Sequence, residues 1–121
     1  MAGCGGSGHP RHTVAASCKR QRAAIASIGP LESLAQAKRG LRRTIDVERR
    51  AVDDLRRARS VEGAPALTRR YETALADTRR FLASIENVDP TQSMAPLQIG
   101  PSGARRAVEV ARRLATATCR L

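Results

Sequence analysis

The chain has 121 residues and a formal net charge of +11, from 22 Lys and Arg against 11 Asp and Glu. It has no Trp, one Phe and one Tyr, so a core must be built from aliphatic side chains and alanines, which suits close helix packing. This length allows one domain with a modest core, and no apolar run approaches the roughly 18 residues of a transmembrane helix. At a sequence pI near 11.4, the surface attracts polyanions.

Residues 1–12 are rich in Gly and lack hydrophobic periodicity, so we expect a flexible tether. Within it, Ala2-Gly3-Cys4 resembles the lipobox, the motif that ends the signal peptide of bacterial lipoproteins, here of a GC-rich, actinobacterial type. Met1 stands where an aliphatic residue is usual, and most of such a signal peptide would lie upstream of it. The resemblance implies that Cys4 is lipidated and that the domain lies outside the cytoplasm, at the cell envelope.

The first predicted helix covers residues 13–28, with Thr13 as its N-cap. Gly29-Pro30 then predicts a stop followed by the start of a second helix, because Pro suits the first helical turn. The apolar residues on one face of the first helix are Val14, Cys18, Ile25 and Ile28.

The second predicted helix, residues 30–60, is the longest element of the expected fold. Its apolar residues recur at three- and four-residue spacing, which places one narrow stripe along the helix. Gly40 interrupts it and predicts a close contact or a slight bend. The stripe consists of Leu31, Leu34, Leu41, Ile45, Val52 and Leu55.

Three arginine pairs recur every seven residues in this helix, which predicts one basic flank. This flank is a candidate anion-binding surface. The interpretation that we favour is a solvated face in which acids such as Asp46 and Asp53, four residues from arginines, form weak ion pairs. The six candidates are Arg42, Arg43, Arg49, Arg50, Arg56 and Arg57.

After a short connection at residues 61–64, Pro65 is expected to start a third helix over residues 65–87. Residues 88–102 contain Pro90, Pro96 and Pro101 and predict a long connection that lies on the bundle as a strap. A fourth helix is expected over residues 103–119.

The predicted fold is therefore all-α: an up-down-up-down four-helix bundle that forms a single domain over residues 13–121, with one long helix and a Pro-rich connection between helices three and four. This topology brings Cys18 and Cys119 to the same end, which predicts a disulfide between them. If the first two helices were instead fused into one kinked helix, the three-helix arrangement would separate these cysteines.

The sequence offers little for catalysis or metal binding. His9 and His12, with Cys4 and Cys18, could supply metal ligands, but their spacing matches no standard zinc pattern. No phosphate-binding glycine loop or paired His and Cys occurs in a helical segment. We therefore predict no enzyme activity, no cofactor, no metal and no small-molecule substrate.

The functional expectation is a non-enzymatic binding or structural module of the cell envelope, with an anionic envelope polymer, lipid headgroups or a protein as its partner. The alternative is an intracellular protein that binds nucleic acid through phosphate contacts of the arginine pairs. It would lack the aromatic platform on which single-strand binders stack bases. Lys38 and Glu48 stand at core-type positions of the second helix and could face solvent or a second subunit.

Overall fold

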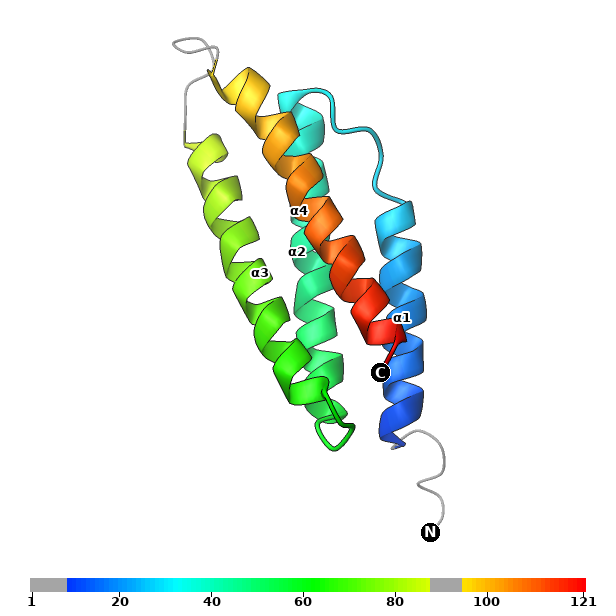
Figure 1. Cartoon of the computed structure of the whole chain (residues 1–121). Helices are drawn as coiled ribbons and strands as arrows, with labels where there is room; N and C mark the ends of the chain where they lie inside the picture. The colour runs from blue at the N-terminus through cyan, green and yellow to red at the C-terminus, as the bar shows by residue number, and fades with distance from the viewer. Residues whose placement is uncertain (1–8, 88–94) are drawn as a thin grey trace.

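The computed structural model of the protein describes residues 9–87 and 95–121 and shows the predicted all-α bundle. Its four helices run alternately up and down (Figure 1), which excludes the fused three-helix alternative. The helices are α1 (Pro10–Ala26), α2 (Leu34–Arg57), α3 (Ala64–Glu86) and α4 (Ala95–Cys119).

Helix α1 begins earlier than predicted, because His9 rather than Thr13 caps it. The His9 side chain accepts a hydrogen bond from the Arg11 amide at 3.2 Å, and Pro10 occupies the first helical position, where its missing N–H costs nothing. Residues 10–12 thus belong to the helix rather than to the expected tether, whose residues 1–8 lie outside the described residues.

Helix α2 begins at Leu34, so the predicted start at Pro30 is wrong. Ser33 and Gln36 form a capping box: the Gln36 amide donates to Ser33 Oγ at 3.1 Å, and the Ser33 amide donates to Gln36 Oε1 at 3.0 Å. Leu31 lies in the preceding loop and packs on Gly40, where a Cβ would collide with Leu31 Cδ2. Gly40 therefore marks the close contact that the sequence predicted as one of two options.

Helix α4 starts at Ala95, eight residues before the predicted position, so the expected strap is wrong for residues 95–102. Pro96 lies in the first turn, where a helix tolerates Pro, whereas Pro101 lies inside the helix and removes one backbone hydrogen bond. Pro101 is buried, and Gly100 lets the helix approach α2 so closely that a Cβ would lie 2.8 Å from Leu34 Cδ1. Packing against α2 thus stabilises helical structure at a Gly-Pro sequence that would ordinarily end a helix. The rest of the expected strap, residues 88–94, lies outside the described residues.

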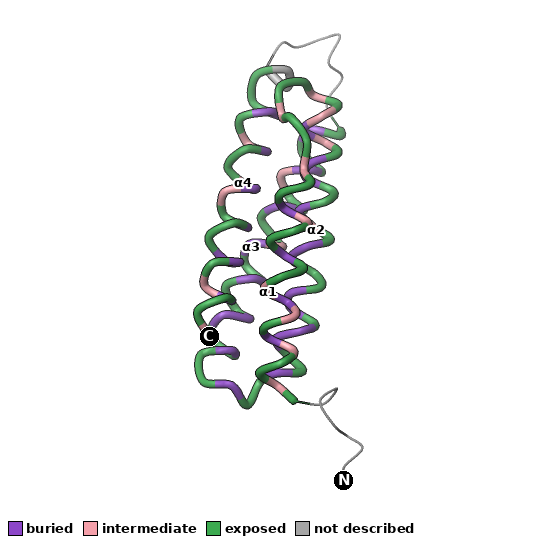
Figure 2. Tube along the Cα trace, turned by 90° about the vertical axis from the view of Figure 1, so that its right-hand side faces the viewer, coloured by how far each residue is buried: buried purple, intermediate pink, exposed green. Residues whose placement is uncertain are grey.

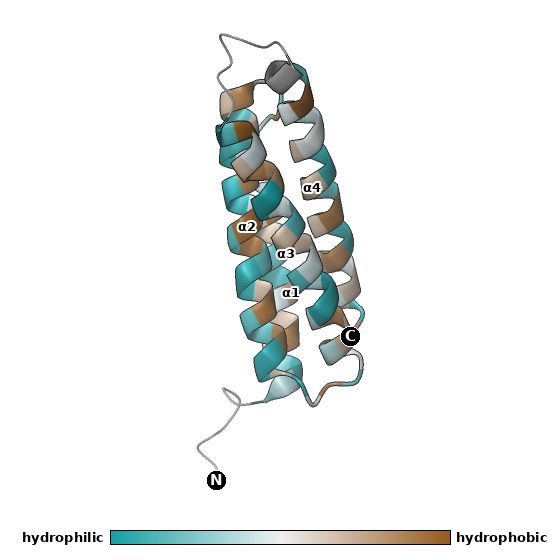
Figure 3. Cartoon of the chain, turned by 90° about the vertical axis from the view of Figure 1, so that its left-hand side faces the viewer, coloured by the Kyte–Doolittle hydropathy of each residue, from teal (hydrophilic) through white to brown (hydrophobic). Residues whose placement is uncertain are grey.

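Because α2 has 24 residues and α4 has 25, α2 is not the single long helix that the sequence predicted. Both α2 and α4 pack against all three other helices. Apolar side chains fill the space between the helices along the whole bundle, from Leu55, Leu67 and Tyr71 at the α2–α3 turn to Leu41 and Ile85 at the opposite end. Buried residues face inward (Figure 2), and hydrophilic residues cover the outer helix surfaces (Figure 3). Among the described helices, none is long and apolar enough to cross a membrane.

Candidate binding groove between α1 and α2

The six predicted arginines do not form one basic flank. Arg42 pairs with Glu86 of α3, and Arg56 Nη2 lies 2.5 Å from Glu72 Oε2 of the same helix. Arg43 instead reaches the end of α1, where its Nη1 lies 3.4 Å from Ser27 Oγ. Consecutive helical residues are about 100° apart, so Arg42 and Arg56 turn toward α3, whereas Arg43 and Arg50 lie on the side of α2 that faces α1.

The predicted ion pairs within α2 are also absent from the described structure, since neither Asp46 nor Asp53 has a cationic partner there. Arg57 instead binds Asp54, three residues earlier, at 2.5 Å. Arg49 is exposed and makes no ion pair among the described residues. The carboxylates that neutralise the α2 arginines thus come mostly from residues that the i,i+4 pattern does not point to.

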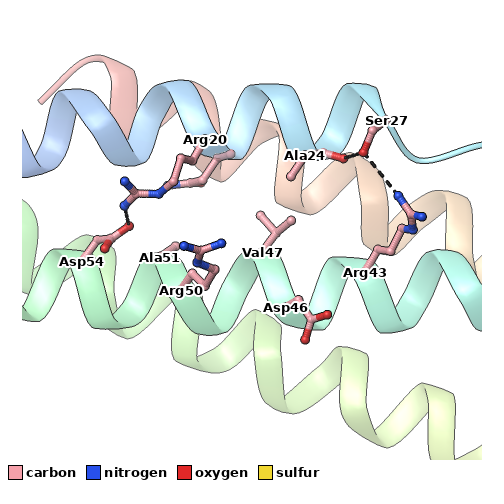
Figure 4. A pocket seen from close by; sticks show the side chains of 10 residues that line it. Arg20, Ala24, Ser27, Arg43, Asp46, Val47, Arg50, Ala51 and Asp54 are labelled. Atoms are coloured by element: carbon pink, nitrogen blue, oxygen red, sulfur yellow. Dashed lines mark hydrogen bonds and ion pairs between the residues drawn. The ribbon is translucent and has the colours of Figure 1, made fainter.

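A groove of about 410 Å³ runs between α1 and α2 (Figure 4). Ala24 of α1 and Val47 and Ala51 of α2 provide its apolar lining. Arg43 and Arg50 line it from α2, and within the described residues neither makes an ion pair. The groove therefore combines an apolar surface with positive charge that the described chain does not neutralise.

An ion-pair cluster closes one end of the groove. Asp54 Oδ2 lies 2.5 Å from Arg20 Nη2 of α1, while its Oδ1 lies 2.5 Å from Arg57 Nη2. The Asp54 side chain is only 5% exposed, and a buried carboxylate requires such partners. At the other end, Ser27 donates to the Ala24 carbonyl at 2.7 Å and receives the contact from Arg43.

The α1 wall of the groove is held by the predicted pair of cysteines. Cys18 of α1 and Cys119 of α4 lie at disulfide distance, with Cα atoms 5.0 Å apart. Gln21, one turn further along α1, lines the groove and also belongs to a buried polar network with Ser17, Tyr71 and Thr118. The disulfide and this network fix α1 against α3 and α4 and so define the position of one groove wall.

Sequence reasoning missed Gln21, although its position carried a signal. It lies seven residues from both Val14 and Ile28, on the face that the first helix buries. A polar residue at such a position needs a partner inside the protein, and the inward-facing Tyr71 and Thr118 supply it. Burial raises the pKa of Tyr71 to about 12, although its hydrogen bonds with Thr118 and Gln21 oppose the shift.

Glu48 is fully buried, which settles one position that the sequence left open, whereas Lys38 is half-buried. Neither carboxylate oxygen of Glu48 has a hydrogen-bond partner among the described residues. Burial raises its pKa to about 7; the nearby Thr78 hydroxyl lowers it, and the negative charge of Asp77 raises it. Thr78 lowers the pKa of Glu48 only slightly, because the Thr78 hydroxyl donates its hydrogen bond to the Ala74 carbonyl at 2.8 Å.

The described residues that the sequence suggested as metal ligands do not line this groove. His9 and His12 lie at the exposed start of α1 with their ring centroids 4.7 Å apart, and Cys18 is paired with Cys119. Residues 9–87 and 95–121 contain no group of three or more His, Cys, Asp or Glu that could hold a metal ion. Cys4, the predicted lipidation site, lies outside the described residues.

Comparisons of the chain with protein-family models, with curated proteins and with solved structures find no match.

Proposed function

We propose that the protein is a non-enzymatic binding module of the cell envelope that holds an anionic partner in the α1–α2 groove. The observation that carries this proposal is that Arg43 and Arg50 line the groove and make no ion pair within the described residues. Arg42, Arg56 and Arg57 already have carboxylate partners. Among the six arginines, only Arg43 and Arg50 both line the groove and lack a carboxylate partner within the described residues.

The cysteines support a location outside the cytoplasm. Structural disulfides persist in oxidising compartments and are rare in the cytosol, and Cys18 and Cys119 are placed for one. The lipobox resemblance at Ala2-Gly3-Cys4 supports a lipid anchor on Cys4, with the following glycines as a spacer between the membrane and the bundle. Such an anchor would hold the groove close to envelope polymers, lipid headgroups and envelope proteins.

The alternative is intracellular binding of nucleic acid through the arginine pairs. Carboxylates already neutralise three of the six arginines, so the arginine pairs do not offer a continuous cationic surface to a phosphate backbone. Non-specific duplex binding would fall log-linearly with salt, so a salt titration tests this alternative. The three neutralised arginines favour the envelope module over binding of nucleic acid.

The proposal is tested by comparing two double variants of equal charge. Arg43→Gln with Arg50→Gln removes the two groove cations that make no ion pair, and Arg69→Gln with Arg79→Gln removes two exposed cations of α3 that also make none among the described residues. The probes are phosphatidylglycerol-containing vesicles, poly-L-glutamate and a short duplex DNA.

We expect vesicles or poly-L-glutamate to bind about tenfold more weakly to the groove variant than to the control, because each exposed charge contact contributes up to about 1 kcal/mol. Equal losses in both variants would show that net charge alone attracts the probe. Binding of duplex DNA alone, or of no probe at all, would also contradict the proposal.

A further inference from the structure

The α2 wall of the groove carries charges of alternating sign. Arg43, Asp46 and Arg50 follow each other at three- and four-residue spacing, so about 10.5 Å separates the first from the last along the helix axis. All three are exposed, and none makes an ion pair within the described residues. Asp54 continues the series, but Arg20 and Arg57 occupy it. The charges offered to a partner are therefore positive, negative and positive.

This alternation separates the classes of partner that the groove could hold. A uniform polyanion places negative charge beside Asp46 as well as beside Arg43 and Arg50, so part of its attraction is lost. A second copy of this chain brings another net charge of +11, which opposes association. A polypeptide helix, in contrast, can place charges of either sign at successive turns, as helices do in coiled coils.

We propose that the α1–α2 groove docks an amphipathic helix of an acidic protein partner, whose acid, base and acid at about i, i+3 or i+4, and i+7 match Arg43, Asp46 and Arg50. This inference rests on the proposed function and deepens it. Residues i and i+7 of a helix share one face two turns apart, so two partner carboxylates reach the two arginines from the same side.

The shape of the groove fits this occupant. Its volume of about 410 Å³ accommodates a few side chains but not a whole helix, so the partner backbone stays at the rim while its small apolar side chains contact Ala24, Val47 and Ala51. Recognition of one helix face by a shallow apolar groove is a recurring mode of peptide binding. The Arg20–Asp54 ion pair closes one end and limits the contact to about two turns of the partner.

The test uses fluorescein-labelled helical peptides of about 18 residues and the oxidised full chain at about 0.15 M salt. The patterned peptide carries Glu at i and i+7 with Lys at i+3; a second peptide has the same composition in permuted order, and a third replaces Lys with Glu. Fluorescence anisotropy should show the patterned peptide binding about tenfold more tightly than the permuted one. Arg43→Gln with Arg50→Gln should abolish that difference, and Arg69→Gln with Arg79→Gln should preserve it.

A charge swap provides the specific control. Asp46→Lys should weaken binding of the patterned peptide about tenfold and should make the third peptide, which carries Glu in place of Lys, the preferred ligand. Asp46 is exposed, and circular dichroism should show that this variant retains the helical fold.

The possible results distinguish failure of helix docking from failure of anion binding. If patterned and permuted peptides bind equally, and both depend on Arg43 and Arg50, helix docking is wrong while anion binding in the groove stands. If the unaltered chain prefers the third peptide or duplex DNA, the partner is a polyanion and the inference is overturned. The inference is also overturned if sedimentation shows that the unaltered chain is a dimer and that the chain with Arg43→Gln and Arg50→Gln is a monomer. If no probe distinguishes the groove variant from the control, both proposals fail.

Discussion

Tyr71 of α3 donates its hydroxyl proton to the side-chain oxygen of Gln21 of α1, and so joins two helices that lie diagonally across the bundle. The Tyr71 oxygen also lies 2.7 Å from Thr118 Oγ1 of α4, and Gln21 Nε2 donates to Ser17 Oγ at 2.9 Å. All four residues are buried, so they satisfy one another where water cannot reach. This network lies beside the Cys18–Cys119 pair and gives three helices one relative position.

Tyr71 is the only tyrosine in a chain that has no tryptophan, so its ionisation can be followed directly. We expect absorbance near 295 nm (the phenolate band) to titrate with a pKa of about 12 in the folded protein, because burial disfavours the phenolate. In urea the same group should titrate near its ordinary pKa of 10.0. The resulting stabilisation is full below pH 10 and is lost as pH rises toward 12. A folded-state titration near pH 10 would contradict the buried placement.

Glu48 should make the protein less stable as pH rises. Its pKa is about 7 in the folded protein, against an ordinary value of 4.5, so the folded state holds a proton that the unfolded state releases between these values. This contribution to the free energy of unfolding is full below pH 4.5, and up to about 3 kcal/mol of it is lost by about pH 8.

Glu48→Gln removes this charge and should flatten the pH dependence measured by urea unfolding between about pH 4 and 8. Glu62→Gln is the control, because Glu62 is exposed and has no ion pair among the described residues. The same slope in Glu48→Gln and in the unaltered chain would assign the pH dependence to other groups.

The Cys18–Cys119 pair should contribute strongly to stability. A bridge between residues 101 positions apart restricts the unfolded chain and is worth up to about 4 to 5 kcal/mol in the chain-entropy model. Dithiothreitol, or Cys18→Ala with Cys119→Ala, should therefore lower the urea midpoint markedly. Mass spectrometry of the unreduced protein should find the linked peptides; two thiols that alkylate freely after purification in air would refute the bridge.

Gly103 should resist substitution although it lies in a helix. A Cβ at this position would collide with the Phe81 ring, so Gly103→Ala should lower the free energy of unfolding by about 1 to 3 kcal/mol, against a helix-propensity gain of about 1 kcal/mol. Gly29→Ala, where no neighbouring atom lies within 4 Å of the added Cβ, should change stability by less than about 0.5 kcal/mol.

Phe81→Leu should provide the rescue, because it removes the ring that the new methyl group meets. Thermal unfolding of the single and double variants measures the coupling. Additive effects of Gly103→Ala and Phe81→Leu would place the two residues out of contact.

Hydrophobic periodicity was sufficient to predict four helices and their order, and the apolar residues that it placed on one face of each of the first two helices are buried or half-buried. The same reasoning placed Cys18 and Cys119 at one end of the bundle, because short connections make neighbouring helices antiparallel. It also predicted helix α3 to within one residue, since Pro65 and the short connection before it are strong local signals.

Contacts between segments far apart in the sequence decided the rest. Pro101 remains helical because α4 packs there against α2, and the arginines of α2 divide because Glu72 and Glu86 come from α3. The same is true of the groove, whose walls belong to two helices and whose closed end depends on Arg20 meeting Asp54. A helical pattern specifies which side of each helix is buried, but the groove and the ion pairs that join two helices arise only where two helices meet, and no pattern within one helix contains that information.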